Sequence, residues 1–393
     1  MNNSGNRWAR SGLAWLTGPA DGPPDYSRSG VLTCAESVAA ELSARLGVTV
    51  DATAALTGRA ALLGLTRRGR ISAGGATRLM ATRDGWCALT LSRPDDVAAV
   101  PALVEADAVP DDPWPTVVDW AARQTSAEVV DRAVLLDLPV ARLAEVSAEA
   151  PRVAAAGPPT QPRPIAGLLV ADLSSMWAGP LCGQILSAAG ATVVKVESPG
   201  RPDGTRFGTK GFYDGVNHGK LSYAIDFDDD RLRALLSVAD IVIEGSRPAA
   251  LARRGVSPQS VPDPGGRVWL RITGHGADSP RVAFGDDAAV AGGLVGTAGD
   301  GPVFCADAVA DPLTGLEAAL AVANSVARGG GEVIDVVMAR VAATYAALPV
   351  EPAAGPTDMQ PPRPPPAAPS AHALGADNAH VDALVAQRLS VTC

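Results

Sequence analysis

Between residues 165 and 345, short apolar runs alternate with longer amphipathic stretches, and this alternation constrains the fold more than any other feature of the sequence. The expected strands cover 165–172, 191–198, 221–227, 240–245, 266–274 and 332–338. The expected helices cover 179–190, 228–239 and 311–330. Strands that alternate with helices form parallel, doubly wound sheets. The sequence therefore predicts an α/β, Rossmann-like domain whose ligands bind beyond the carboxyl ends of the strands.

The remaining chain divides at Pro-rich stretches, which are typical of domain boundaries and connectors. A helix, a strand pair around Asp84–Gly85 and a helix–turn–helix predict a smaller α+β domain. The expected parts are a partial repeat and connecting segment (1–64), the small domain (65–153), the large domain (165–349), a Pro-rich linker (350–371) and a terminal helix (372–393). Residues 154–164 are read as the boundary between the two domains.

A faint internal repeat connects the two ends of the chain. Residues 11–24, a helix and residues 48–61 resemble residues 292–303, a helix and residues 332–343. The first copy has no aspartate at the position of the later ADPLTG. This pattern suggests a duplicated segment in which only the later copy kept chemistry.

Charge and cysteine usage exclude several classes of protein. The net charge of −9 disfavours a nucleic-acid partner. The five cysteines have no paired spacing and the four histidines have no metal-ligand spacing, so we expect no disulfide framework and no metal site. Without an apolar signal segment or a run of about 18 apolar residues, the sequence predicts a cytoplasmic protein with no membrane partner.

Six segments follow one another in the chain: VADLSSMWAGP and its continuation (170–206), NHGKLSYAIDF (217–227), ADIVIEGSRPAALARRGVSP (239–258), WLRITGHG (269–276), ADPLTGLEAALAV (310–322) and GGGEVIDVVM (329–338). In this order they resemble the class III coenzyme A transferases, a family that includes formyl-CoA and carnitine CoA-transferases and α-methylacyl-CoA racemases. The small domain also resembles that of the family, but here it precedes the large domain. The chain therefore looks like a permuted or truncated relative of two-copy members.

The resemblance implies transfer of CoA between an acyl-CoA thioester and a free carboxylic acid. These two small molecules are then the partners, with CoA as a substrate and no prosthetic group. The resemblance also implies a homodimer, because the family forms interlocked dimers.

Asp311 has two compatible interpretations. Asp-Pro before a long apolar helix is a good N-cap with proline in the first turn. The resemblance instead makes Asp311 the nucleophile, which forms a mixed anhydride and then a thioester with CoA. A helix N-terminus favours the ionised carboxylate, so we expect an exposed, ionised Asp311.

Asp286 and Asp287 are the other candidate catalytic residues. Transferases of the family often have Tyr-Asp there and racemases His-Asp, so Asp287 matches the shared acid and Asp286 departs from both. A turn or a helix cap is the alternative for both residues, and adjacent carboxylates near a third would raise a pKa. The alternative functions are an α-methylacyl-CoA racemase or epimerase, which the missing histidine disfavours, and a non-catalytic CoA-binding protein.

The resemblance places CoA contacts on loops that follow the strands. The residues implied are Trp177, Ala178, Ser198, Arg201, Ile225, Asp226, Gly245, Ser246, Arg247 and Arg253. Ser198 stands where the family often has arginine, with Arg201 as a possible substitute, and Asp228 stands where lysine is common. A main-chain N–H near Trp177 would stabilise an oxyanion, although packing and surface charge are the ordinary alternatives for these residues. The Gly-rich stretch 292–301 is either a mobile cover or an ordinary loop.

Overall fold

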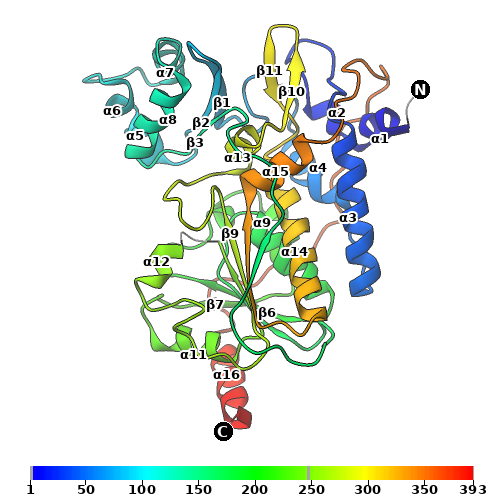
Figure 1. Cartoon of the computed structure of the whole chain (residues 1–393), viewed down its shortest axis with the longest axis vertical. Helices are drawn as coiled ribbons and strands as arrows, with labels where there is room; N and C mark the ends of the chain where they lie inside the picture. The colour runs from blue at the N-terminus through cyan, green and yellow to red at the C-terminus, as the bar shows by residue number, and fades with distance from the viewer. Residues whose placement is uncertain (1–2, 246–247, 393) are drawn as a thin grey trace.

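The computed structural model describes residues 3–245 and 248–392 of the chain. A large sheet with helices on both faces forms one end of the molecule, and a smaller α+β unit lies at the other end (Figure 1). In the described ranges, no helix combines the length and the apolarity that are needed to span a bilayer.

The large sheet has the strand order β4-β12-β9-β8-β5-β6-β7. The strands are β4 (Arg152–Ala155), β5 (Leu169–Asp172), β6 (Thr192–Glu197), β7 (Leu221–Ala224), β8 (Ile241–Glu244), β9 (Val268–Thr273) and β12 (Glu332–Val337). All neighbours pair in parallel except β4, which is antiparallel to β12. From β7 to β12 this is the Rossmann order, with its switch point between β5 and β8. The predicted fold class is therefore confirmed.

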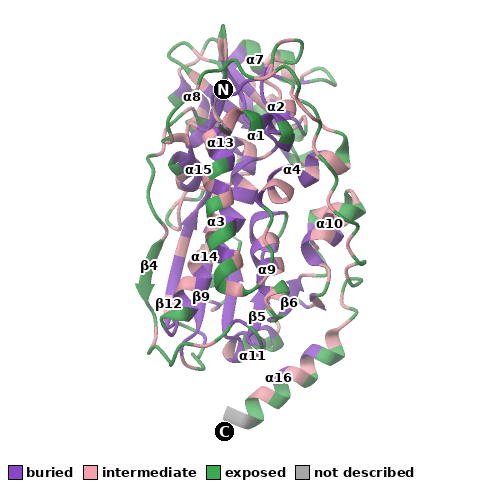
Figure 2. Cartoon of the chain, turned by 90° about the vertical axis from the view of Figure 1, so that its right-hand side faces the viewer, coloured by how far each residue is buried: buried purple, intermediate pink, exposed green. Residues whose placement is uncertain are grey.

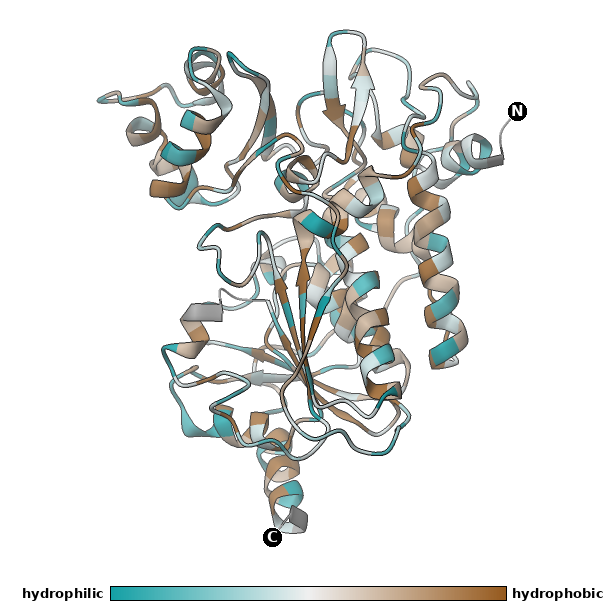
Figure 3. Cartoon of the chain, viewed as in Figure 1, coloured by the Kyte–Doolittle hydropathy of each residue, from teal (hydrophilic) through white to brown (hydrophobic). Residues whose placement is uncertain are grey.

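Alternating side chains of the buried strands supply two cores, one on each face of the sheet. Val170 of β5 packs in the core beneath α9 (Ala178–Ala188) and α14 (Ala310–Ala327). Leu169 and Ala171 pack in the opposite core, beneath α11 (Asp230–Val238) and α16 (Asn378–Thr392). The inner strands are correspondingly hydrophobic (Figure 3) and buried, whereas the edge strand β4 is exposed (Figure 2).

The N-terminal helices are built into the first of these cores. They are α1 (Asn3–Ser11), α2 (Leu13–Leu16), α3 (Gly30–Leu46) and α4 (Ala52–Leu63). Trp8, Leu32 and Leu56 share the cluster with Leu313 of α14, and α3 packs along α14. In the internal repeat, α3 corresponds to α14, and α4 corresponds to α15 (Met338–Ala346). Residues 48–51, which correspond to the start of β12, form no strand.

The smaller unit has a hydrophobic cluster of its own, which includes Met80, Leu89, Val117 and Val129. Its strands are β1 (Thr77–Ala81), β2 (Trp86–Thr90) and β3 (Val140–Arg142), and its helices are α5 (Pro94–Ala98), α6 (Val100–Val104), α7 (Trp114–Ala121) and α8 (Ser126–Leu135). β1 and β2 are antiparallel around Asp84–Gly85, as the sequence predicts.

The remaining elements lie in the segments that connect those already described. They are η1 (Gly204–Phe207), α10 (Lys210–Asn217), α12 (Pro248–Ala252), α13 (Gly285–Ala291), β10 (Val295–Ala298) and β11 (Gly301–Phe304). The predicted boundary begins inside β4, and the glycine-rich stretch 292–301 forms most of a β10–β11 hairpin rather than a cover. Residues 350–371 form no helix or strand, and the Tyr26 hydroxyl donates to the Pro356 carbonyl at 2.6 Å.

Candidate active site

A cavity of about 180 Å³ lies beyond the carboxyl ends of β5, β8 and β9. It is lined by Ser174 and Met176 after β5, by Gly245 after β8 and by Gly274 after β9. Because the first two loops flank the topological switch point, this is where a doubly wound sheet binds its ligands. We refer to it as the smaller pocket.

A second cavity, of about 340 Å³, lies between the large sheet and the smaller unit. The N-terminal helices, the smaller unit and the large sheet domain all line it: Arg59 lies on α4, Thr77 on β1 and Trp177 before α9. This larger pocket shares Met176, Phe284 and Asp311 with the smaller one. Among the described lining residues, Asp311 is the one carboxylate common to both pockets.

Asp311 is the second residue of α14, not its N-cap, so the predicted cap interpretation is wrong. The helix begins at Ala310 because the preceding turn places Ala306 and Ala308 at positive φ and the Asp311 N–H on the Ala308 carbonyl. The Gly285 N–H donates to the Asp311 carboxylate. A Cβ at Gly285 would lie 2.4 Å from Asp311 Oδ2, so glycine is needed for this approach.

The expectation of an exposed, ionised Asp311 is also corrected. Asp311 is half-buried, and burial raises its pKa to about 7, with Asp286 and Asp307 adding like charge. The Arg59 cation and the Gly285 N–H lower the pKa but do not outweigh burial. At neutral pH the carboxyl group is therefore close to its midpoint of ionisation.

Asp286 and Asp287, the first two aspartates of α13, have different surroundings. Asp286 lines the larger pocket, accepts the Ala308 N–H at 3.0 Å, and has a pKa that burial raises to about 6. Asp287 lines neither pocket and is 0% exposed. Its Oδ1 accepts from the Thr90 hydroxyl at 2.9 Å and from the Phe284 N–H at 3.0 Å. Asp287 therefore caps α13 and ties it to β2, outside both pockets.

The sequence interpretation missed Arg59 and Asp307. Arg59 Nη1 donates to both carboxylate oxygens of buried Asp307, at 2.7 Å each. The guanidinium carbon lies 5.5 Å from the ring centroid of Trp177 and 5.7 Å from that of Phe212, which are cation–π distances. The two residues are 248 positions apart, and no local pattern signals such a pair.

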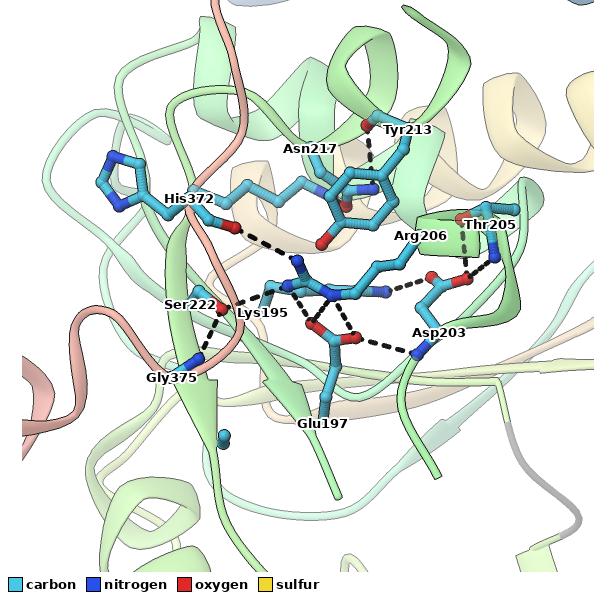
Figure 4. A network of polar contacts seen from close by, with 12 residues as sticks. Lys195, Glu197, Asp203, Thr205, Arg206, Tyr213, Asn217, Ser222, His372 and Gly375 are labelled. Carbon is cyan, nitrogen blue, oxygen red and sulfur yellow. Dashed lines mark hydrogen bonds and ion pairs between the residues drawn. The ribbon is translucent and has the colours of Figure 1, made fainter. Parts of the chain in front are cut away.

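A buried ion network holds the loop that leads into α9. Asp203 accepts the Met176 N–H at 3.2 Å and an ammonium N–H of Lys195 at 2.8 Å, and its own N–H donates to Glu197 at 2.8 Å. Figure 4 shows this network continuing from Glu197 to Arg206 and onward to the C-terminal segment at the His372 carbonyl. These bonds fix Met176 at a φ of 73°, which non-glycine residues rarely adopt. The network therefore positions a residue shared by the two pockets.

A second buried ion pair contacts the same loop, which connects β5 to α9. Lys220 Nζ contacts Asp172 Oδ2 at 2.9 Å, and both side chains are 0% exposed. Asp172 in turn accepts the Ser174 N–H at 3.1 Å. Burial alone would raise the pKa of Asp172, but Lys220 and Lys195 outweigh it and hold that pKa below its ordinary value.

Residues 165–376, which contain both ion pairs and Asp311, match the family model described as CoA-transferase family III. The chain belongs to CoA-transferase family III. It is 30% identical over 198 residues to succinyl-CoA–D-citramalate CoA-transferase of Chloroflexus aurantiacus, covering 44% of this chain and 49% of that protein. It is 31% identical over 208 residues to succinate–glutarate CoA-transferase of Agrobacterium fabrum, covering 46% and 52%. The chain thus spans about half the length of the curated relatives it matches.

Among solved structures, this family III chain is similar to a CaiB/BaiF family protein from Brucella suis, over 48% of this chain and 56% of that protein. The identity is 27% and the TM-score is 0.42. The matched family region ends before the terminal helix α16 and does not include α4 or the smaller unit. Arg59, Thr77 and Thr90 therefore reach the larger pocket of this family III chain from segments that the family model does not cover.

The structure separates the predicted CoA contacts of this family III chain into two groups. Trp177, Ala178 and Gly245 line the pockets. The others that are described lie outside both pockets: Ser198, Arg201, Ile225, Asp226 and Arg253. Ser198, Arg201 and Asp226 lie together where β6 and β7 end, with the Ser198 hydroxyl 3.5 Å from Asp226 Oδ1. Ser246 and Arg247 lie outside the described residues.

Proposed function

We propose that this chain transfers CoA from an acyl-CoA thioester to a free carboxylic acid, with Asp311 as the nucleophile. The observation that carries the proposal is the position of Asp311, where the two pockets meet. A carboxylate there can be reached by a thioester from one side and by an acid from the other. The names of the relatives include succinate, glutarate and D-citramalate, but we assign no acid to this chain from those names.

The proposed reaction has four balanced steps. An Asp311 oxygen attacks the thioester carbonyl, forming a C–O bond and releasing CoA thiolate. The thiolate attacks the aspartyl carbonyl of this anhydride, forming aspartyl-CoA and freeing the first acid. The second acid's carboxylate attacks aspartyl-CoA and again expels thiolate. The thiolate then takes the new acyl group from the second anhydride and regenerates the Asp311 carboxylate.

The first turn of α9 is suited to stabilise the oxyanions of these steps. Ala178 and Gly179 open the helix and line the smaller pocket together with Asp311. N–H groups in a first helical turn have no acceptor within their helix, and such donors stabilise developing oxyanions. We therefore assign the thioester carbonyl to the smaller pocket, in agreement with the predicted role of the main chain near Trp177.

A racemase is the second candidate function, because Asp286 and Asp311 line the same pocket and burial raises both pKa values. Two carboxyl groups with pKa values near neutrality can act as an acid and a base. Exchange of the α-proton for solvent deuterium without any acceptor acid distinguishes this reaction. The transferase proposal predicts no such exchange that is independent of CoA transfer.

A screen of CoA transfer over a panel of acyl-CoA donors and free acids tests the proposed function. We expect new acyl-CoA products with at least one donor and acid pair. Bound CoA without turnover across the panel would contradict the proposal and support a non-catalytic CoA-binding protein. The homodimer remains a prediction, which the mass from size-exclusion chromatography with light scattering measures.

The raised pKa of Asp311 predicts a pH dependence. Only the ionised carboxylate attacks the thioester, so kcat/KM for acyl-CoA should rise about tenfold per pH unit below pH 7 and level off above it. Because Asp286 adds like charge, Asp286→Asn should move the inflection to lower pH. A profile that is flat from pH 5 to 8, or an inflection that does not move, would contradict this account of Asp311.

A further inference from the structure

We propose that the larger pocket binds the free acid through Arg59, and that this acid is a monocarboxylate with an apolar body. The inference rests on the proposed function, because it assigns the second substrate of the same site. Arg59 reaches the pocket from α4, outside the region that matches the family model. It is the one lysine or arginine among the described residues that line this pocket.

The Arg59 guanidinium is held in place by Asp307 and two aromatic rings, and it still has N–H groups that can donate to a ligand. Among the described residues, the guanidinium hydrogen bonds come from Nη1 and go to Asp307. The group is held near the Trp177 and Phe212 rings, whose centroids are 5.2 Å apart and whose planes are nearly perpendicular. Its side chain is 26% exposed. Nε and Nη2 are thus available for a carboxylate, which arginine binds in a fixed planar geometry.

Arg59 and Asp311 line the same pocket, and the Arg59 cation lowers the pKa of Asp311. A carboxylate held by Arg59 is therefore in the same pocket as the carbon that it must attack. In that step its oxygen bonds to the carbonyl carbon of Asp311-CoA, the C–S bond breaks, and CoA leaves as the thiolate. Arg59 gives the incoming anion a cationic hydrogen-bond donor in a pocket that Asp286 and Asp311 also line.

Apart from Arg59, the described residues that line the pocket offer no positive charge for a second carboxylate. Apolar side chains line much of it: Leu63, Ala76, Trp177, Phe212 and Phe284. The Thr77 and Thr90 hydroxyls lie 2.9 Å apart and bond to each other and to Asp286 and Asp287. Burying an unpaired charge is costly. Without a second cation in this lining, a dicarboxylate would place its second charge against uncharged groups or beside Asp286, which selects for monocarboxylates.

Isothermal titration calorimetry on the whole chain tests the proposal without requiring turnover. The ligands are butyrate and hexanoate, each matched with the dicarboxylate of the same carbon number, succinate and adipate. We expect each monocarboxylate to bind at least about tenfold more tightly than its partner, because one unpaired charge is avoided. Equal or tighter binding of the dicarboxylates would overturn the monocarboxylate assignment.

Arg59→Lys tests the anchor while keeping a cation beside Asp307. Lysine cannot donate the two parallel hydrogen bonds that a guanidinium makes to a carboxylate, so monocarboxylate binding should weaken by about tenfold or more. The control is Arg45→Met, which removes an exposed arginine paired with Glu41 on α3 and should not change acid binding. Unchanged affinity in Arg59→Lys would overturn the role of Arg59.

The same variants separate this inference from the proposed function. Arg59→Lys should raise the KM for the acid in complete transfer, while formation of Asp311-CoA from acyl-CoA remains. If acids bind as expected but Asp311 never acquires CoA, the proposed function fails and the acid site stands. If Asp311 acquires CoA but Arg59→Lys leaves the KM for the acid unchanged, the acid site fails and the proposed function stands.

Discussion

Asp311→Asn should lower the rate of CoA transfer by at least about a thousandfold, the scale of loss when a covalent nucleophile is removed. The amide keeps the shape of the side chain but cannot form the anhydride or release CoA from it. Initial rates with a donor and acid pair that supports transfer measure the effect. Binding of CoA should remain, because the pocket walls are unchanged.

The matched control is Asp229→Asn, at the N-cap of α11. Asp229 lines neither pocket, and asparagine is an equally good N-cap, so transfer should proceed at the unmutated rate. Transfer by Asp311→Asn at more than about a tenth of that rate would show that another group carries the acyl chain.

Lys220→Met should lower the free energy of unfolding by about 3–5 kcal/mol, because it leaves the Asp172 carboxylate buried without its partner. The double variant Lys220→Met, Asp172→Leu removes both charges and should recover most of this loss. Urea denaturation followed by circular dichroism measures both variants.

Arg45→Met is the control for this stability prediction. Its ion pair with Glu41 is exposed on α3, so its removal should change the free energy of unfolding by less than about 1 kcal/mol. A similar small loss in Lys220→Met would show that the buried pair does not hold the loop after β5.

The fold could be predicted from the sequence because its signals are local. Each inner strand is a short apolar run, and long helices such as α14 follow a periodic pattern, so their order along the chain indicates a doubly wound sheet. Residues 292–301 are predicted as a mobile cover or an ordinary loop, because glycine favours turns and loops alike. The hairpin was missed, because it depends on pairing such as that of Val295 with Phe304.

The candidate site could be predicted only in part. Asp311 and Trp177 stand in segments that resemble the family, Asp286 stands beside the matching Asp287, and Asp311, Asp286 and Trp177 line the larger pocket. The charge state of Asp311 could not be foreseen, because it depends on burial and on Arg59, which lies on another helix. Arg59 and Thr77 come from segments that only the tertiary structure brings to the pocket, where they contact Asp307 and Asp286. Ser198 and Arg201 stand at strand ends, yet the structure places them outside both pockets.

The most direct test of the central claim is to locate the covalent intermediate. The chain is incubated with an acyl-CoA donor, treated with hydroxylamine, digested and analysed by peptide mass spectrometry. The account predicts a hydroxamate at Asp311 that requires acyl-CoA and is absent from Asp311→Asn. CoA transfer with an unmodified Asp311, or with the hydroxamate on Asp286, would contradict it.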